Sequence, residues 1–506
     1  MLRVIGWITY MRHYSNTSRF RRSCCPAPSE VLSFVSENNQ SPQRSLSAFD
    51  GACIIIGIII GAGIYQTTPM VAANSGSVEW ILGIWVIGGC LALVGALCYA
   101  ELAMTVTQAG GEYAYLVKAY GKGTGSFFAW IEFWIIRPGS TGPMAMLFGN
   151  YANKLFPLFP ATLDPLISEI LYAVLATTVL LAVNLFGLRA GKLTQNVLTV
   201  FKVVALLILV GGSVIAIGLS TDVIVPATAE TVASTGGQSF DGFLLAMVLV
   251  MFTYGGWNDL SFIATEMKNP AKNIPRALVL GVCAVSVIYL LINIAMLMAL
   301  GHAGLAASQT PATEMLKVTI GPVAEKIMAL LICITALGAV NGMMFTSARI
   351  YHALGNQVSA FAWLGKWNSR LQVPARSLVV QSVVTLAMVI GFGWQTNGFE
   401  LLVLFVSPFM WSFFVLLGIA MLLFRFQGLV PRDKYRTPLF PIMPLVFVLS
   451  SGFIAYRAAD YFLFRVESME LLRNPFFMGL SIATVLVVLS GMVVALISRK
   501  NDSADG

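Results

Sequence analysis

Charged residues and histidines are scarce in this sequence. Of its 506 residues only 11% are charged, whereas soluble globular domains carry about 25%, so the chain has no large soluble domain. The three histidines lack the spacing of a metal-ligand set, and we expect no metal site and no cofactor. The sequence contains no phosphate-binding loop, nucleophile elbow or catalytic dyad, which argues against an enzyme and against an ATP-driven pump.

Cysteines are also few, and most of the seven lie inside apolar runs, where they are better explained as small buried hydrophobes than as disulfides or metal ligands. Hydrophobic residues, in contrast, make up 57% of the chain. This composition is typical of a polytopic membrane protein, so the lipid bilayer is its expected surrounding. The net charge of +8 would suggest nucleic-acid binding in a soluble protein. Here the distribution of the basic residues along the chain indicates membrane topology instead, and we expect no nucleic-acid partner.

The apolar runs predict an all-α membrane protein with twelve transmembrane helices. A span needs about 20 residues, and suitable runs occupy residues 47–73, 81–106, 124–153, 166–186, 193–219, 240–264, 276–301, 322–350, 374–394, 398–425, 438–463 and 475–498. They divide the chain into a basic tail (1–46), two blocks of five helices (47–219 and 240–425), a final helix pair (438–498) and a short tail (499–506).

Lysines and arginines orient these spans. If both termini are cytoplasmic, 23 of the 31 lie on cytoplasmic segments. This is the positive-inside pattern, and it predicts a multi-pass protein of the plasma or inner membrane with both termini in the cytoplasm. The tail has no acidic residue before Glu30, which is the composition of a targeting segment or of a disordered tail; we favour the tail.

Two predicted spans carry glycines near their midpoints. The first contains "GIIIGAGIY" (57–65) and the sixth contains "FTYGGWND" (252–259). A glycine in a helix interior costs about 1 kcal/mol relative to alanine. Glycines in a membrane helix usually serve close packing, but corresponding interruptions in two oppositely oriented blocks indicate an inverted-repeat transporter. We therefore predict that helices 1 and 6 are broken at mid-membrane within a 5+5 inverted repeat.

Such interruptions expose backbone groups, which survive at membrane depth only where they line protein or a wet cavity. The amino-terminal end of a half-helix suits an anion and the carboxyl-terminal end suits a cation. A zwitterionic amino acid carries both charges on neighbouring atoms. Its carboxylate would bind the N–H groups of Ala62, Gly63 and Ile64, and its ammonium would bind carbonyls near Ile59, Phe252, Thr253 and Gly255.

Several long motifs follow one another in order: "GIIIGAGIY", "GALCYAELAMTV", "GGEYAYLVKAYG", "WIEFWIIRPGS", "NVLTVFKVVAL", "FTYGGWN", "TEMKNPAKNIPRAL" and "GAVNGMMFTSAR". Through them the chain resembles the amino acid–polyamine–organocation superfamily from about residue 47 to 440. It is most similar to the L-type amino acid transporters, the light subunits of heteromeric exchangers. The resemblance implies a leucine-transporter-like fold and sodium-independent amino acid transport by alternating access, often as obligatory exchange.

The resemblance also implies the substrate-contacting residues. They are Ile59, Gly61, Ala62, Gly63 and Ile64 in helix 1, and Phe252, Thr253, Gly255, Gly256, Trp257 and Asn258 in helix 6. Phe252 matches an aromatic residue that closes over substrate in the family. The family often has serine where this chain has Ala62, so carboxylate binding would rely more on the backbone.

Helices 3, 8 and 10 are expected to line the pocket for the substrate side chain. The residues placed there are Ser140, Gly338, Asn341 and Met410. Because no acid lies clearly among them, we expect neutral rather than cationic amino acids.

Two features depart from the family. The animal light subunits carry a cysteine between helices 3 and 4 that joins a heavy chain, but residues 153–166 contain none, so we expect no disulfide-linked heavy chain. The loop after helix 8 also differs from the usual family pattern.

Lys202, inside helix 5, is expensive to bury and needs a partner or a purpose. In relatives a lysine here occupies the volume where sodium-coupled members bind sodium. We expect its ammonium to touch the helix 1 break, as a substitute for the cation or as the carrier of a coupling proton. The alternative is a structural charge that pins helices 1 and 5 together.

The remaining ionisable residues within the spans receive structural roles. Glu132 and Arg137, five residues apart, should point about 140° away from each other on an α-helix, so we expect no direct pair. Glu101 is expected to anchor the following "GGEYAYL" loop. Glu266 and Arg349 are expected to be charges of a cytoplasmic gate.

These observations favour a secondary amino acid exchanger, with a proton-coupled symporter as the alternative. A membrane-embedded enzyme would need a cluster of catalytic residues at one depth, which is not found in the sequence. A channel would normally share its filter among several subunits.

Overall fold

The computed structural model describes residues 44–61, 63–160, 162–219, 240–393, 398–431, 433–460 and 475–504. Over these ranges the chain is helical, and its only β-type pairings are two isolated bridges, Leu46–Met267 and Asn368–Val373. The predictions for residues 1–43 of the basic tail, and for Ala62, lie outside the described residues.

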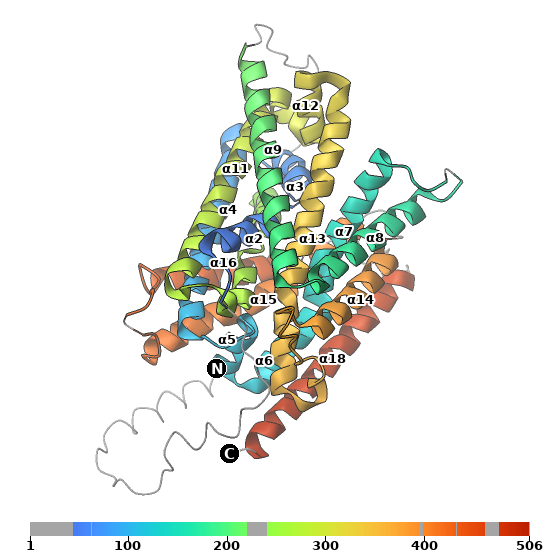
Figure 1. Cartoon of the computed structure of the whole chain (residues 1–506). Helices are drawn as coiled ribbons and strands as arrows, with labels where there is room; N and C mark the ends of the chain where they lie inside the picture. Colours follow the sequence, from blue (N-terminus) through green and yellow to red (C-terminus); the bar gives the residue numbers. More distant parts are fainter. Residues whose placement is uncertain are drawn as a thin grey trace, which may run out of the picture. The chain divides into compact units, whose positions relative to one another are not determined.

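The helices follow the predicted ranges closely (Figure 1). In chain order they are α2 (Ala48–Ile59), α3 (Gly63–Ala73), α4 (Val78–Thr105), α5 (Glu112–Tyr120), α6 (Lys122–Ile131), the π-helix η1 (Glu132–Ile136), α7 (Arg137–Leu155), α8 (Pro165–Leu185), α9 (Leu188–Leu219), α10 (Phe240–Thr253), the 3₁₀-helix η2 (Trp257–Glu266), α11 (Pro270–Ala307), α12 (Pro311–Ile320), η3 (Gly321–Val323), α13 (Ala324–Gln357), η4 (Ser359–Phe361), α14 (Ala375–Phe392), α15 (Gly398–Phe426), α16 (Ile442–Asp460) and α18 (Pro475–Ala504).

Ten helices in the described ranges are long and apolar enough to cross a membrane, or eleven when α2 and α3 count as one bent span. The predicted third span is divided among α6, η1 and α7, which follow one another without a gap. Two short helices, α5 and α12, were not predicted, because nine or ten residues are too few for a span.

Both predicted interruptions are present. The axes of α2 and α3 meet at 50° across the residues between Ile59 and Gly63. The second interruption follows Thr253, where α10 ends, and the chain resumes as the 3₁₀-helix η2 at Trp257. Gly256 adopts a φ of +116°, which glycine tolerates without steric cost. A Cβ at this position would also approach the Ile58 side chain to 2.6 Å, so the two interruptions lie against each other.

Helix α2 packs against α9, α11 and α13, three long helices that Figure 1 shows beside it. Glycines allow each approach: a Cβ on Gly57 would overlap the Gln195 side chain of α9, and one on Gly281 or Gly342 would crowd an isoleucine of α2. Small residues at such contacts let helix backbones come close, which is the main source of packing energy between helices in a membrane.

The start of α2 is fixed by polar contacts. Ser47 and Asp50 form a capping box, in which each side chain accepts the backbone N–H of the other residue. Asp50 also accepts a hydrogen bond of 2.7 Å from the amide of Asn196 and lies 3.5 Å from the ammonium of Lys192, both on α9. The preceding Leu46 donates its N–H to the carbonyl of Glu266, so the chain before α2 is joined to the end of η2.

The close approach at Gly57 predicts a stability effect. In Gly57→Ala the added methyl group must displace both Gln195 and Thr199, and overpacking of this kind costs about 1–3 kcal/mol. We expect a lower thermal midpoint for this variant, measured on the purified protein in detergent. Gly83→Ala is the control, because nothing lies within 4 Å of its added Cβ; equal midpoints for the two variants would contradict the packing described here.

Candidate functional site

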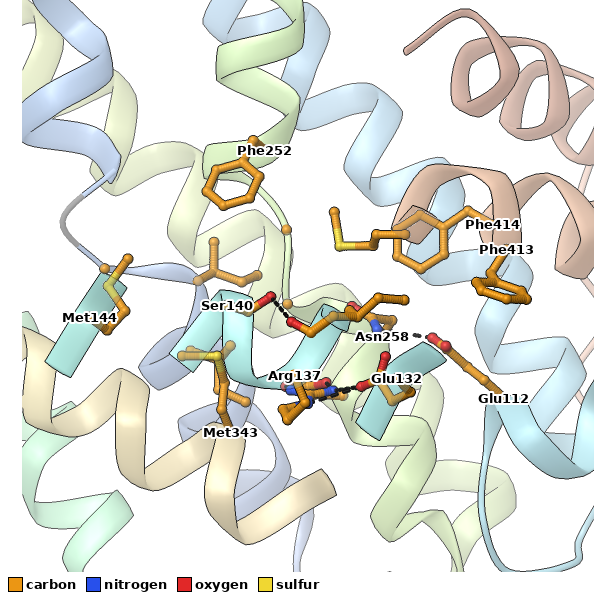
Figure 2. Close-up of a pocket in the computed structure, with 18 of the residues that line it drawn as sticks. Glu112, Glu132, Arg137, Ser140, Met144, Phe252, Asn258, Met343, Phe413 and Phe414 are labelled. Carbon is orange, nitrogen blue, oxygen red and sulfur yellow. Dashed lines mark hydrogen bonds and ion pairs between the residues drawn. The ribbon is translucent and has the colours of Figure 1, made fainter. Parts of the chain in front are cut away.

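One pocket lies where the two interruptions meet (Figure 2). Its walls come from both interrupted spans, from α5 to α7, and from α13 and α15. The residues lining it are Ile58, Ile59, Gly61, Gly63, Glu112, Phe128, Glu132, Ile136, Arg137, Ser140, Met144, Phe252, Thr253, Gly255, Gly256, Asn258, Asp259, Met343, Met410, Phe413 and Phe414. In Figure 2, Phe252 lies on one side of the pocket, and Arg137 and Glu132 lie on the opposite side.

Helix ends supply partial charges to the pocket. Helix α3 begins at Gly63, so its first N–H groups point toward the interruption and carry its positive end. Helices α2 and α10 end there with their carbonyl groups and supply negative ends. The pocket therefore offers donors and acceptors within one small volume, the arrangement that a zwitterion matches.

A tyrosine joins the two carboxyl-terminal ends. The Tyr289 hydroxyl, on α11, lies 2.7 Å from the carbonyl oxygen of Ile59 and 3.2 Å from that of Thr253. Sequence reasoning missed Tyr289. Its signal was a single tyrosine in the apolar stretch "SVIYLLIN" (286–293), since a buried tyrosine hydroxyl normally has a polar partner.

Lys202 is fully buried and contacts the first interruption. Its ammonium donates to the carbonyl oxygens of Gly57 at 2.7 Å and Ile60 at 2.8 Å. The predicted contact with the helix 1 break is thus present. Gly338, which was predicted to line the side-chain pocket, instead faces Lys202: a Cβ there would lie 3.2 Å from the lysine nitrogen.

The expectation that Glu132 and Arg137 do not pair is wrong. Arg137 donates to Glu132 Oε1 at 2.6 Å and 3.0 Å. The reason is the π-helix η1, in which the Arg137 N–H bonds the Glu132 carbonyl five residues earlier. Widening the helix by one residue per turn places these two side chains on the same face, whereas an α-helix would separate them.

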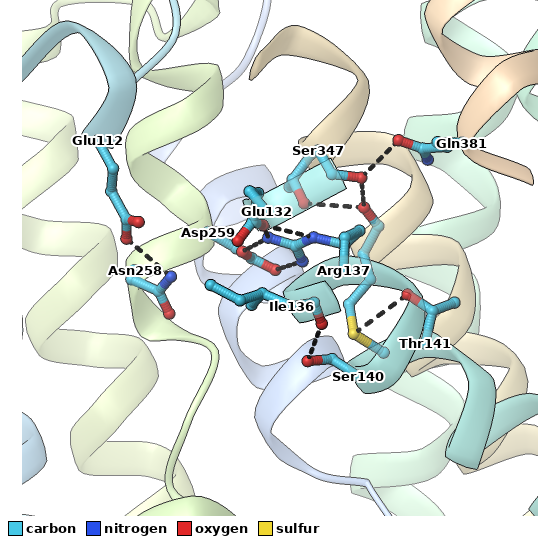
Figure 3. Close-up of polar contacts among 12 residues, drawn as sticks. Glu112, Glu132, Ile136, Arg137, Ser140, Thr141, Asn258, Asp259, Ser347 and Gln381 are labelled. Carbon is cyan, nitrogen blue, oxygen red and sulfur yellow. Dashed lines mark hydrogen bonds and ion pairs between the residues drawn. The ribbon is translucent and has the colours of Figure 1, made fainter. Parts of the chain in front are cut away.

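Arg137 also joins the two halves of the site. Its Nη1 and Nη2 atoms lie 3.0 Å and 2.9 Å from the carboxylate oxygens of Asp259 on η2 (Figure 3). All three charged residues are at least 95% buried. A guanidinium in this fork geometry satisfies two carboxylates at once, so it fixes the segment after the second interruption to the third span.

Glu112 is a further acid in the pocket, brought there by the unpredicted helix α5. Its Oε1 accepts hydrogen bonds from the Tyr99 hydroxyl at 2.8 Å and from the Asn258 amide at 2.9 Å. Only 2% of the residue is exposed. No acid is among the four side-chain pocket residues expected from the sequence, but Glu112, Glu132 and Asp259 all line the pocket as well.

The other predicted pocket residues divide into two groups. Ile59, Gly61, Gly63, Phe252, Thr253, Gly255, Gly256, Asn258, Ser140 and Met410 line the pocket. Ile64, Trp257, Gly338 and Asn341 do not. The Ile64 side chain is buried, and the Trp257 ring packs against Tyr99, Phe414 and Phe447.

Asn341 points away from the pocket because it belongs to a buried polar network. Its side chain accepts a hydrogen bond from Asn184 of α8 and donates one to Gln195 of α9, both at 2.8 Å. The network ties α8, α9 and α13 together. It gives hydrogen-bond partners to both polar atoms of Asn341 and to Gln195 Oε1, which would be costly to leave unpaired inside an apolar bundle.

Two other predicted charges have defined partners. Glu266 and Arg349, placed together from the sequence, form a buried pair with an Nε–Oε1 distance of 2.8 Å. Glu101 does not anchor the "GGEYAYL" loop as expected; it binds Arg425 at the end of α15 and accepts the N–H of Thr437. It therefore anchors the connection between α15 and α16.

Comparison with known proteins agrees with this architecture. The family model described as amino acid permease matches residues 46–489. The chain belongs to the amino acid permease family. It is therefore a multi-pass membrane transporter rather than an enzyme, and the resemblance seen in the sequence motifs is confirmed.

Curated members of the amino acid permease family align over most of the chain. The b(0,+)-type amino acid transporter 1 of Mus musculus is 30% identical over 415 residues, which cover 82% of each chain. The human form of that protein is 29% identical over 421 residues, again 82% of each chain. The human Large neutral amino acids transporter small subunit 2 is 30% identical over 406 residues, 78% of this chain and 73% of the relative.

The buried pairing of Arg137 predicts a large stability effect. Arg137→Gln removes the cation between Glu132 and Asp259 and leaves two buried carboxylates facing each other, which costs about 3–5 kcal/mol. We expect a strongly reduced yield of monodisperse protein and a lower thermal midpoint. Lys317→Gln is the control: it breaks the exposed pair with Glu325, which should change stability by less than about 1 kcal/mol. A normal thermal midpoint for Arg137→Gln would contradict the role given to this ion cluster.

Proposed function

We propose that this permease is a sodium-independent amino acid exchanger that works by alternating access. The observation that carries the proposal is the pocket between the two helix interruptions, where the start of α3 faces the ends of α2 and α10. Amino-terminal helix ends favour anions and carboxyl-terminal ends favour cations. A zwitterionic amino acid fits both within the length of its backbone.

The substrate carboxylate would bind the backbone N–H groups of Ala62, Gly63 and Ile64. Its ammonium would bind the carbonyl groups of Ile59, Phe252, Thr253 and Gly255. The Tyr289 hydroxyl shares its one proton between two of these oxygens, but a carbonyl oxygen has a second lone pair and can accept another donor. Ile64 would contribute through its N–H group, which is consistent with its buried side chain.

The substrate side chain would enter the part of the pocket near Ser140, Met144, Met343 and Met410. Thioether side chains are apolar and adapt to different shapes, which supports neutral amino acids as the main substrates. One relative is named as a transporter of large neutral amino acids, and this agrees with the proposal. Phe252 would close over the bound substrate from the side that it occupies in Figure 2.

Alternating access needs contacts that form and break at one end of the bundle. Glu266 is suited to this role, because its side chain binds Arg349 and its carbonyl accepts the N–H groups of Ser45 and Leu46. These contacts join the start of α2, the end of η2 and the end of α13. We propose that they form the cytoplasmic gate of a protein with twelve spans, a 5+5 inverted repeat and both termini in the cytoplasm of the plasma or inner membrane.

Lys202 would replace a coupling cation. Its ammonium holds the carbonyl groups of Gly57 and Ile60, a task that a bound metal cation performs with the same oxygen chemistry. This supports sodium-independent transport. A lysine in this position can also carry a proton, and the corresponding second candidate is a proton-coupled symporter.

The proposal includes no disulfide-linked heavy chain. Residues 153–166 contain no cysteine. The two exposed cysteines in the described ranges, Cys90 and Cys283, lie within α4 and α11 rather than in a connecting segment. Electrophoresis of the purified membrane protein with and without reductant tests this point.

Counterflow in proteoliposomes tests the proposed function. Vesicles loaded with excess unlabelled leucine, in sodium-free buffer at equal pH on both sides, should accumulate labelled leucine transiently and saturably. Matched vesicles without internal amino acid should accumulate little. Equal uptake in both preparations would exclude obligatory exchange, and uptake driven by a pH gradient into empty vesicles would favour the symporter.

Lys202→Met tests the cation substitute. Methionine fills a similar volume but leaves the Gly57 and Ile60 carbonyl groups without a donor, and hydrogen bonds to charged groups contribute about 1.5–3 kcal/mol each. We expect leucine exchange by Lys202→Met in sodium-free buffer to fall at least about tenfold. The control Lys154→Met, at an exposed position, should exchange leucine as the wild type does. If Lys202→Met kept the full pH-dependent exchange of the wild type, Lys202 would have no role in transport.

A further inference from the structure

The pocket holds more negative than positive charge. Three carboxyl groups line it, those of Glu112, Glu132 and Asp259, and Arg137 is the one cation among the lining residues. The N–H groups of Arg137 already bind both Glu132 and Asp259. Glu112 is therefore left without a cationic partner in the part of the chain that the structure describes.

Glu112 has an oxygen atom available to the pocket. Both hydrogen bonds to this carboxyl group, from Tyr99 and Asn258, end on Oε1. Oε2 accepts none from the described residues, and Glu112 lines the same pocket as the two interruptions. Figure 2 shows the carboxyl group beside Asn258 at the pocket wall. A nearly buried acid with an unpartnered oxygen facing a cavity requires a proton or a cation there.

The surroundings of Glu112 determine whether its carboxyl group binds a proton or a cation. Glu132 on η1 and Asp259 on η2 are negative, and Arg137 on α7 is already paired with both. Tyr99 on α4 and Tyr115 on α5 are neutral phenols that face the same carboxyl group. Helix α5 lies between two spans, and burial together with Glu132 and Asp259 raises the pKa of Glu112 to about 8, despite its hydrogen bonds.

We propose that Glu112 is a proton-binding site that opens into the substrate pocket, and that its protonation selects the charge of the substrate side chain. This inference rests on the proposed exchange function. With the proton on Oε2, the pocket accepts a neutral side chain. When a cationic side chain enters, the proton leaves Oε2 for water in the pocket, and the carboxylate pairs with the new cation. One positive charge replaces another, so the pocket keeps the same net charge.

The sign of the pH dependence follows. Because the pKa of Glu112 is about 8, its carboxyl group is mainly protonated at pH 6.5 and leucine is preferred there. Between pH 6.5 and 8.5 the ionised fraction rises more than tenfold, whereas the lysine side chain keeps its charge over this range. Exchange of external lysine, relative to external leucine, should therefore rise about tenfold or more in wild-type proteoliposomes loaded with leucine, with equal pH on both sides.

Glu112→Gln is the diagnostic variant. The amide oxygen can accept the same hydrogen bonds from Tyr99 and Asn258 but cannot ionise, so the ratio of lysine to leucine exchange should stay low and independent of pH. Glu79→Gln, an exposed acid in the first turn of α4, should keep the wild-type pH profile. A Glu112→Gln ratio that still rises with pH would overturn the inference.

Proton release on substrate binding tests the inference on the wild-type protein alone. Lysine added to purified protein in weakly buffered detergent solution at pH 7 should release protons, which an indicator dye detects, whereas leucine should release none. No proton release with bound lysine, or no lysine exchange at pH 8.5 while leucine exchanges normally, would overturn the inference and leave the exchanger intact. Absence of exchange with every amino acid would overturn the proposed function itself.

Discussion

Backbone groups released by a broken helix need partners inside the protein, because lipid supplies none. The rest of the site depends on this constraint. Lys202 binds the carbonyl groups of Gly57 and Ile60, and the Tyr289 hydroxyl binds those of Ile59 and Thr253. Two side chains from surrounding helices thus stabilise both interruptions, and the remaining hydrogen-bonding capacity of the helix ends faces the pocket. The proposed site for a zwitterion follows from the way in which the fold satisfies its own backbone.

A second constraint concerns charge. The guanidinium group of Arg137 connects the third span to the segment after the second interruption, and the π-helix η1 brings Glu132 onto the same guanidinium group. One extra residue in the turn places Glu132 and Arg137 on one face, and Arg137 also binds Asp259. π-Helical turns are frequent at functional sites, and here the turn arranges a buried ion cluster in the wall of the pocket.

Helical structure and the two interruptions were predictable from local patterns. Apolar runs of about 20 residues fixed the helix ranges, and the glycines of "GIIIGAGIY" and "FTYGGWND" marked the breaks, because glycine weakens a helix wherever it stands. Asn341 shows the limit of that reasoning. Its position on the eighth predicted span favoured a pocket role, but its amide binds Asn184 and Gln195 instead, and no spacing in the sequence identifies partners more than 140 residues away.

The sequence by itself determined the class of protein, the helices, the sites of interruption and the membership in a transporter family, because each depends on composition or on neighbours along the chain. Only the tertiary structure decided which charged groups share the pocket. The short helix α5 carries Glu112 into the pocket, and the π-helical turn brings Arg137 onto Glu132. The position of Glu112 depends on packing between distant segments, and the contact between Arg137 and Glu132 depends on one extra residue in a helical turn. The hydrophobic periodicity of a single segment encodes neither of them.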